Sequence, residues 1–303
     1  MMRLHCVQAG TQLPNELLSI IINELASDSD KRTLATLASC RLASHVLCSL
    51  ATPFFFSSIE LTGGLGPWLS RRQDFENQAT KLNQLLTQTT YDIAASIRTL
   101  TLRCNGVTLK NSINATLTSE ILRRLPHIRN FTLESDFSSI TKNFSSAIHA
   151  LCRPNLTTLD IFGMLQFPIT FITACPNLRC LRVEAIEFCV NSIFSVLSVI
   201  ANPRLQFDNT NPTDEIFYLD SLEIDNSSID SLDYVIFHNQ SFAKYFSRIK
   251  NFRLKDLSDE DDVLSVPWDI ILLASQSLTT LDISWDKERK FHLDICIAAG
   301  MCS

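Results

Sequence analysis

Cysteine and histidine are the residues of this 303-residue chain whose spacing could support metal binding or catalysis. Cys175, Cys180 and Cys189 are separated by four and then eight residues, and no histidine lies nearby to complete a tetrahedral site. His292 and Asp294 are too close together in a strand or short helix to suggest a catalytic pair. The chain contains neither GxSxG nor HExxH. We therefore expect no metal site, no cofactor and no enzymatic activity, and an enzyme is the least favoured of the alternatives.

The overall composition limits the class of protein and its partners. A hydrophobic content of 46% indicates a folded chain, and a net charge of −6 with a pI near 5.5 argues against nucleic acid as a partner. The first twelve residues have no apolar core typical of a secretory signal, and no window approaches 18 consecutive apolar residues. We therefore expect no membrane association, a cytoplasmic or nuclear location, and reduced cysteines that behave as small apolar residues.

A helix with an unusually wide apolar surface is predicted near the amino terminus, beginning at about Pro14 or Asn15. At about 100° per residue, the apolar side chains from Leu17 to Leu25 cover an arc of about 200°, with Glu24 inside it. A surface helix needs little more than about 100° to face its own core. Either this helix is buried on all sides, or one face packs on its own core and the other binds a partner.

One six-residue phrase recurs along the chain, with apolar residues at its first, fourth and sixth positions. Its copies are IRTLTL at Ile97, IRNFTL at Ile128, LTTLDI at Leu156, LRCLRV at Leu178, LDSLEI at Leu219, IKNFRL at Ile249 and LTTLDI at Leu278. A weaker copy, FSSIEL, begins at Phe56. Each copy has the alternation of a short strand, and several intervening helical segments end at a proline, as at Pro126, Pro154 and Pro176. A strand and a helix repeated about every 30 residues predict an α/β solenoid of parallel strands backed by helices.

These phrases, especially CRPNLTTLDI and CPNLRCLRV, resemble irregular, helix-backed leucine-rich repeats over roughly residues 96 to 286. The resemblance implies a curved solenoid with strands on the concave side and helices on the convex side. The family often has Asn or Cys three residues after the phrase, and only Asn105 meets that pattern here.

The amino-terminal segment resembles an F-box, a three-helix domain. The motif of Leu-Pro, any residue, Glu and two spaced apolar residues is met by Leu13, Pro14, Glu16, Leu17 and Ile21, and Leu34, Leu37, Cys40 and Arg41 match its middle. Leu42, Val46 and Leu50 are expected to form a third helical stripe, and Pro53 to end the helices.

The F-box resemblance implies a partner, because F-boxes bind the Skp adaptor of cullin-RING ubiquitin ligases while the following domain captures the protein to be ubiquitinated. The adaptor-binding residues would be Leu13, Pro14, Glu16, Leu17, Ile20, Ile21, Leu37, Cys40 and Arg41. Leu42, Ala43 and Ser44 stand where the family often has an aromatic residue. This departure keeps open a second hypothesis, a leucine-rich-repeat scaffold without a ligase role.

The predicted organisation has four parts: a flexible amino terminus at 1–11, the F-box at 12–56, a linking segment at 57–95 and the repeat domain at 96–303. The linking segment contains a strand, the glycine-rich TGGLGPW and a helix from Trp68 to Thr90. The apolar segment Phe291 to Ser303 is either a short helix that covers the last repeat or the beginning of repeats that are missing. We expect a buried helix at Phe188–Ala201, a loop at Asn202–Glu215 and a solvated acidic loop at Ser258–Asp262.

The variable strand positions predict where a target protein would bind. They form a central column with a column on each side, and they mix both charges with one aromatic ring, which suits a protein surface. The expected target-binding residues are Thr101, Thr132, Asp160, Phe162, Arg182, Glu223, Arg253 and Asp282. The alternative for each residue taken singly is an ordinary solvated sheet face.

Overall fold

The computed structural model describes residues 13–27, 31–63, 68–88, 93–104, 112–139, 148, 151, 155–165, 167–189, 218–229, 231–232, 240–257, 265–285 and 289–294. The chain divides into two compact units, residues 1–58 and residues 59–303. The buried helix expected at Phe188–Ala201 does not begin at Phe188, because Phe188–Cys189 form the short strand β7. The rest of that segment, the expected loop at Asn202–Glu215 and the expected acidic loop at Ser258–Asp262 lie outside the described residues.

The first unit consists of three helices, α1 (Asn15–Ser27), α2 (Lys31–Ala43) and α3 (His45–Phe55). Helix α1 begins where predicted, directly after Pro14, whose carbonyl accepts the N–H groups of Leu17 and Leu18 at 3.0 and 3.1 Å. Ile22, Leu37 and Ala51, one residue from each helix, form the buried core of this unit. Leu25, Leu47, Leu50 and other partly buried side chains pack against that core.

Two details of α2 and α3 differ from the sequence prediction. Leu42 does not share a helix with Val46, because Ser44 is extended and caps α3 by accepting the N–H of Leu47 at 3.1 Å. Pro53 lies inside α3 and does not end it. The proline removes one bond of the helix, the one that its own N–H would donate to the carbonyl four residues earlier, and the ladder resumes after it, since the Phe56 N–H donates to the Thr52 carbonyl at 3.1 Å.

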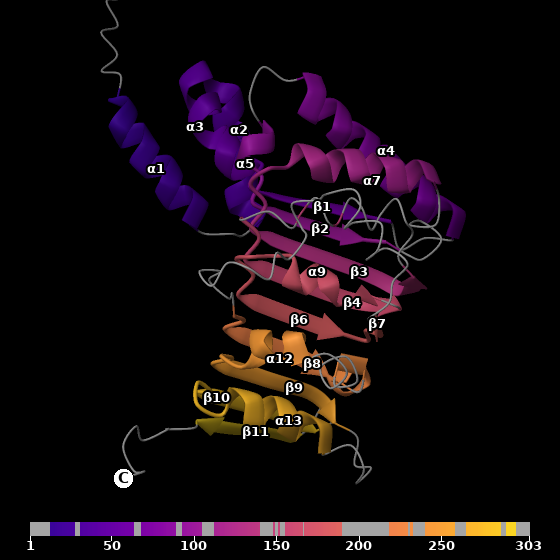
Figure 1. The fold of residues 1–303 in the computed structure, drawn as a ribbon. Helices are drawn as coiled ribbons and strands as arrows, with labels where there is room; N and C mark the ends of the chain where they lie inside the picture. Colours follow the sequence, from indigo (N-terminus) through magenta and orange to yellow (C-terminus); the bar gives the residue numbers. More distant parts are fainter. Residues whose placement is uncertain are drawn as a thin grey trace, which may run out of the picture. The chain divides into compact units, whose positions relative to one another are not determined.

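The second unit is built on a nine-stranded sheet, and the predicted α/β class with parallel strands is confirmed. The strands, in spatial order, are β1 (Ser58–Thr62), β2 (Thr99–Arg103), β3 (Asn130–Ser139), β4 (Thr158–Leu165), β6 (Cys180–Glu184), β8 (Ser221–Asp225), β9 (Asn251–Leu257), β10 (Thr280–Trp285) and β11 (Arg289–Asp294). From β2 to β10 each neighbouring pair is parallel. Because the chain returns to the same end of the sheet before each strand from β3 to β10, strands separated by a helix or a long connection lie side by side (Figure 1).

The carboxyl-terminal edge of the sheet departs from the repeat. We expected Phe291–Ser303 to be either a short helix or the beginning of further repeats, but Phe291–Asp294 belong to a strand, β11, which pairs antiparallel with β10 after a three-residue connection. Residues 295–303 lie outside the described residues. A parallel neighbour would need a longer crossover. The chain therefore turns back on itself at this edge.

The apolar positions of the repeated phrase account for the core of the second unit. All seven first positions and all seven fourth positions are buried, from Ile97 and Leu100 to Leu278 and Leu281. Six of the seven sixth positions are buried as well, and Ile283 in the last copy is partly exposed. The weaker copy at Phe56 supplies β1, in which Leu61 is buried.

The second position of each phrase links one repeat to the next through its backbone. Its carbonyl oxygen accepts the N–H groups of two consecutive residues at the start of the next strand, at 2.7–3.0 Å. The accepting carbonyls belong to Arg98, Arg129, Thr157, Arg179, Asp220 and Lys250. The phrase is thus a structural repeat, since equivalent residues make equivalent contacts in six consecutive copies.

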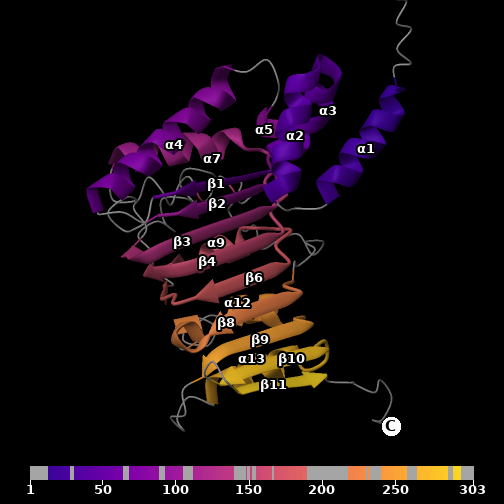
Figure 2. The same ribbon diagram turned by 180° about the vertical axis from the view of Figure 1, so that it is seen from behind.

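Helices α4 (Trp68–Gln88), α5 (Ile93–Ser96), α7 (Ser112–Arg124), α9 (Thr170–Thr173), α12 (Gln240–Phe246) and α13 (Ser265–Ala274) connect the strands. Helix α4 lies within the predicted range, with Phe75, Ala79 and Leu82 buried along one stripe. Helices α9, α12 and α13 lie on one face of the sheet, in front of the strands in Figure 1 and behind them in Figure 2. The opposite face carries the variable strand positions.

Candidate functional site

The exposed surface of α1 is the first candidate site. Leu13, just before the helix, and Leu17, Ile20 and Ile21 within it are 52%, 46%, 61% and 48% exposed. Taking Leu17 as zero, these side chains lie between about 300° and about 40° around the helix axis. The core residue Ile22 lies near 140°. One continuous apolar arc is thus divided between a face on the core of this unit and a face left uncovered.

The other expected adaptor-binding residues divide into exposed and internal groups. Pro14 and Glu16 are exposed beside the apolar face of α1. Leu37 is only 1% exposed and belongs to the core, so it supports the three-helix unit and offers no surface to a partner. Cys40 is partly buried and packs against the same core. Leu37 therefore contributes to the core of the unit, while contact between these residues and an adaptor remains a prediction.

Arg41 makes contacts within its own unit. Its guanidinium group lies 4.7 Å from the ring centroid of Phe55 and 4.6 Å from that of Phe56. Its Nε–H donates to Oγ1 of Thr52 at 3.2 Å. A cation over two aromatic faces stabilises the contact between α2 and α3. This is a structural role that the sequence motif did not reveal.

Three further exposed apolar residues lie on α2 and α3 and were not among the expected binding residues. Leu34 is 46% exposed, Leu42 is 89% exposed and Val46 is 38% exposed. The sequence places them in helices, but helical spacing alone could not tell which side of each helix faces the small core. Together with α1, they give each of the three helices an apolar side chain facing solvent.

The second candidate site is the face of the sheet opposite helices α9, α12 and α13, which we call the open face. The strand registers align Thr101, Thr132, Asp160, Arg182, Glu223, Arg253 and Asp282 as Cα partners in one column across seven strands. This is the predicted central column. Phe162 lies in a neighbouring column, where it pairs with Glu134 and Glu184. The structure thus brings all eight expected target-binding residues onto one face of the sheet.

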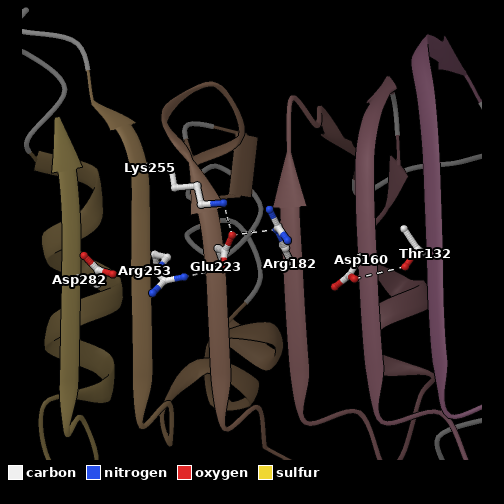
Figure 3. Close-up of polar contacts among 7 residues, drawn as sticks. All are labelled: Thr132, Asp160, Arg182, Glu223, Arg253, Lys255 and Asp282. Carbon is white, nitrogen blue, oxygen red and sulfur yellow. Dashed lines mark hydrogen bonds and ion pairs between the residues drawn. The ribbon is translucent and has the colours of Figure 1, made fainter. Parts of the chain in front are cut away.

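Five charged residues of this column alternate in sign from β4 to β10, and we call them the ionic ladder: Asp160, Arg182, Glu223, Arg253 and Asp282. Glu223 is its centre (Figure 3). Arg182 Nε lies 2.8 Å from Glu223 Oε1, Arg253 Nη1 lies 3.5 Å from Glu223 Oε2, and Lys255 from the next column contacts Oε1 as well. Arg253 also donates from Nε to Asp282 Oδ2 at 2.8 Å. The ladder from Arg182 to Asp282 is therefore paired within the chain.

Arg182 Nε and Glu223 Oε1 lie 2.8 Å apart, but they are not aligned for a hydrogen bond. Their contact is therefore an ion pair only. The Arg182 guanidinium also lies 5.1 Å from the centroid of the Phe162 ring. Arg182 is consequently held by charge and by ring stacking, and it remains 42% exposed.

Asp160 stands at the end of the ladder beside the uncharged threonines of β2 and β3. Thr132 Oγ1 donates to Asp160 Oδ2 at 3.3 Å. Burial raises the pKa of the Asp160 carboxyl above its ordinary value, while the hydrogen bond from Thr132 and the charge of Arg182 act in the opposite direction. Burial and the nearby charges of Asp220 and Asp160 raise the pKa of the Cys180 thiol, so Cys180 is not an activated nucleophile.

Two further ion-pair groups lie on the same sheet, outside the central column. Arg103 contacts Glu60 at 3.0 Å and Glu134 at 2.9 Å, which links β1, β2 and β3. Asp220 contacts Arg179 at 3.9 Å and Lys250 at 2.9 Å. Pairing across adjacent strands is therefore a general feature of this unit.

Asp225 has a structural role, although it falls in a variable strand position beside the ladder. It is 7% exposed, and it accepts the N–H groups of Ser228 and Ala185, each at 3.1 Å. Ala185 has a φ of 54°, in the left-handed region that costs a non-glycine residue about 1 kcal/mol. Ser228 and Ser231 bind the N–H groups of Ile186 and Phe188 at 2.8 and 3.1 Å.

These side chains satisfy the turn that follows β6. The leucine-rich-repeat resemblance implied asparagine or cysteine in such turns, and here an aspartate and two serines from the next repeat take that function. A sequence pattern could have predicted this role: Asp225-x-x-Ser228-x-x-Ser231 is a hydrogen-bond acceptor followed by two hydroxyl groups at helical spacing.

Within the described residues, no group of three or more His, Cys, Asp or Glu side chains could hold a metal ion. In the same part of the chain, no helix is both long enough and apolar enough to cross a membrane. A comparison with models of known protein families finds no match, and a comparison with curated protein sequences finds none either. The geometry of the two surfaces therefore carries the functional argument.

Proposed function

We propose that this chain is the substrate-recognition subunit of a Skp–cullin–F-box ubiquitin ligase. In this proposal the three-helix unit is an F-box that binds the Skp adaptor and, through it, a cullin. The sheet is a leucine-rich-repeat domain whose open face binds the target protein. The chain contributes binding and no chemistry of its own, and it acts in the cytoplasm or nucleus, where such ligases work.

The observation that carries the proposal is the uncovered apolar face of α1. Leu13, Leu17, Ile20 and Ile21 are each about half exposed although they follow one another along one side of the helix. Contiguous exposed apolar surface of this kind marks an interaction site. The same residues belong to the segment that resembles an F-box.

The free energy gained by burying this face shows whether α1 alone could hold a partner. Fully burying a Leu or Ile side chain contributes about 1.5–3 kcal/mol, so covering four half-exposed side chains contributes about 3–6 kcal/mol. A micromolar complex requires about 8 kcal/mol after association costs. Helix α1 is therefore not sufficient alone, and we expect Leu34, Leu42 or Val46 to contribute as well.

The test is a binding measurement between the purified chain and a purified Skp adaptor. Ile20→Asp places a charge in the exposed apolar face, and Asn23→Asp is its matched control. Asn23 is exposed on the same helix but lies about 60° outside that face, and the control introduces the same new charge. Neither side chain is part of the core, so both variants should keep their helical circular dichroism.

We expect Ile20→Asp to weaken adaptor binding by about 10–100-fold, whereas Asn23→Asp should weaken it by less than about 3-fold. Equal effects of the two variants would mean that the apolar face is not the contact. If the unaltered chain binds no Skp adaptor at all, the ligase proposal is wrong.

The second half of the proposal, target binding on the open face, can be tested by a charge exchange within the ionic ladder. Exchanging one pair, with Arg253→Asp and Asp282→Arg together, keeps an ion pair between β9 and β10 and reverses its direction. The exchange also places a carboxylate beside Glu223 in place of the Arg253 guanidinium, so the variant is compared only after its circular dichroism and unfolding midpoint match those of the unaltered chain. Proteins captured by the unaltered chain and lost by the exchanged variant are candidate targets. An unchanged set of captured proteins would place target binding elsewhere.

A repeat scaffold without a ligase role is the second candidate, and one observation favours it. Leu42, Ala43 and Ser44 supply no aromatic ring after Arg41, and Arg41 itself lies over Phe55 and Phe56 of its own unit. This candidate keeps target binding at the sheet and predicts no adaptor binding, so the same measurement separates the two.

A further inference from the structure

The amino ends of the strands carry a row of cations, Arg98, Arg129, Arg179 and Lys250, which we call the basic edge. Because β2 to β10 run in the same direction, these ends lie along one edge of the sheet (Figure 1). The four cations are second positions of the repeated phrase, which read Arg, Arg, Thr, Arg, Asp, Lys and Thr from Arg98 to Thr279.

This concentration of positive charge is local. The seven second positions hold four cations and one carboxylate. The seven positions directly after the phrase, from Arg103 to Ser284, hold two cations and three carboxylates. The whole chain carries a net charge of −6. The basic edge therefore differs in charge from the rest of an acidic protein.

Backbone hydrogen bonds keep the second positions in line. The Arg98 carbonyl accepts the N–H of Arg129 at 2.7 Å, and equivalent bonds join each later second position to the next. Neighbouring strands lie about 4.8 Å apart, and β9 is the fifth strand beyond β2, so Arg98 and Lys250 are about 24 Å apart. An extended peptide rises about 3.3 Å per residue, so about seven or eight residues would span the row.

The positive charge of this edge is only partly cancelled within the described residues. Asp220, the single carboxylate among the second positions, lies 3.9 Å from Arg179 Nε and 2.9 Å from Lys250 Nζ, and these cations remain 47% and 58% exposed. Arg98 donates to two backbone carbonyl oxygens, which carry no net charge. The exposed Arg129 guanidinium makes no hydrogen bond or ion pair with another described residue.

The ends of the helices do not explain the row. A cation in the last turn of a helix is stabilised by the helix dipole, which accounts for Arg124 of α7 and Lys244 of α12. This effect falls off within that turn. Arg129 and Arg179 lie five and six residues beyond the ends of α7 and α9. Their charge is therefore available to an anionic partner.

The details of the edge favour an acidic peptide over a nucleic acid. The bases of a single strand stack on uncovered aromatic rings. Here the Arg248 guanidinium lies 4.0 Å from the centroid of the Tyr218 ring, and Lys244 Nζ lies 5.6 Å from that of Tyr245. Asp220 would also repel a continuous row of phosphates, whereas a peptide can place a neutral residue beside it.

We propose that the basic edge binds an extended acidic segment of a partner protein, whose carboxylates pair with Arg98, Arg129, Arg179 and Lys250. The edge is separate from the apolar face of α1 and from the open face of the sheet. The inference therefore does not rest on the proposed function, and its test contains no Skp adaptor and no target protein.

Binding of a defined peptide to the full chain is the first test. Fluorescence anisotropy of a labelled octaglutamate peptide should show saturable binding at low salt, whereas a labelled Gly-Ser peptide of equal length should not bind. Raising the salt concentration from about 0.05 M to about 0.5 M should weaken octaglutamate binding by at least about 10-fold. Absence of binding, or binding indifferent to salt, would overturn the proposal. So would tighter binding of a labelled eight-nucleotide dT strand, because the edge would then be a nucleic-acid site.

Neutral substitutions test the position of the contact. Arg129→Gln together with Lys250→Gln should weaken octaglutamate binding by about 3–30-fold. Arg32→Gln together with Lys81→Gln is the matched control, because it removes the same charge from exposed residues of α2 and α4. The control should weaken binding by less than about 2-fold. Equal losses in the two double variants would overturn the proposal.

Asp220→Asn provides a readout that misfolding cannot imitate. It removes the one carboxylate of the row and leaves Arg179 and Lys250 without an internal anion. We expect octaglutamate to bind this variant about 2–5-fold more tightly than the unaltered chain. Unchanged or weaker binding would overturn the proposal.

Discussion

Replacing Glu223 with glutamine tests whether the ionic ladder stabilises the second unit. The substitution keeps the size of the side chain and removes the charge on which Arg182, Arg253 and Lys255 converge. The three cations would then lie close together without the carboxylate that separates them. We expect a loss of stability from the lost attraction and from their mutual repulsion.

The expected loss of unfolding free energy depends on how exposed Glu223 is and on which other partners Arg182 and Arg253 keep. Exposed ion pairs contribute about 0.2–1 kcal/mol each, and Glu223 is only 19% exposed, which places its pairs in the upper part of that range. Arg253 keeps Asp282 and Arg182 keeps the ring of Phe162, so part of the interaction survives. We therefore expect Glu223→Gln to cost about 1–2 kcal/mol, or about 3–6 °C in a unit of this size.

Urea unfolding followed by circular dichroism is the assay, at low and at high salt. Asp282→Asn is the matched control, because it removes one contact with Arg253 and should cost about 0.5 kcal/mol. The loss in Glu223→Gln should shrink as salt screens the ladder. A change in Glu223→Gln of less than about 0.5 kcal/mol, or one no larger than that in Asp282→Asn, would show that the ladder has no stabilising centre.

Three further substitutions test individual contacts. Because burial raises the pKa of Asp160, its ionised form is disfavoured in the folded chain, and this cost appears as pH rises above the ordinary carboxyl value. Asp160→Asn should therefore be more stable than the unaltered chain near pH 7, with the difference disappearing toward about pH 3 in urea titrations; a difference independent of pH would contradict this. Arg41→Ala should cost the three-helix unit about 1–2 kcal/mol in thermal unfolding, and an equally stable Arg41→Lys would show that stacking on two rings is unimportant. Asp225→Ala should cost about 2–4 kcal/mol, more than any ladder acid, because a buried and a partly buried N–H group lose their acceptor; amide exchange at Ser228 and Ala185 would show that loss directly.

The repeat architecture could be predicted because it depends on a local pattern. In a strand, alternate side chains face opposite sides, so apolar residues at the fourth and sixth positions determine which face is buried. Leu100, Phe131 and Leu159 are buried as this rule requires, and Thr101, Thr132 and Asp160 form one column. The wide apolar arc of α1 is likewise a property of its sequence.

The partners of long or polar side chains could not be predicted in the same way. Alternation assigns Glu223 and Asp225 to neighbouring positions of one strand, but it does not show that three cations converge on the first while the second caps a turn. Apart from that between Asp225 and Ser228, these contacts join residues about 30 to 40 positions apart in the chain. The same holds for Leu37 and Arg41, since a helical pattern does not show which neighbouring helix occupies each side.

The sequence alone determined the parallel α/β repeat, the alignment of its columns and the excess of apolar surface on α1, because each follows from the periodicity of neighbouring residues. Tertiary structure decided which charges are paired, which turn residues replace the expected asparagines, and that the last strand pairs antiparallel with β10. Those outcomes depend on distances between separate repeats, and such distances exist only after the repeats have stacked.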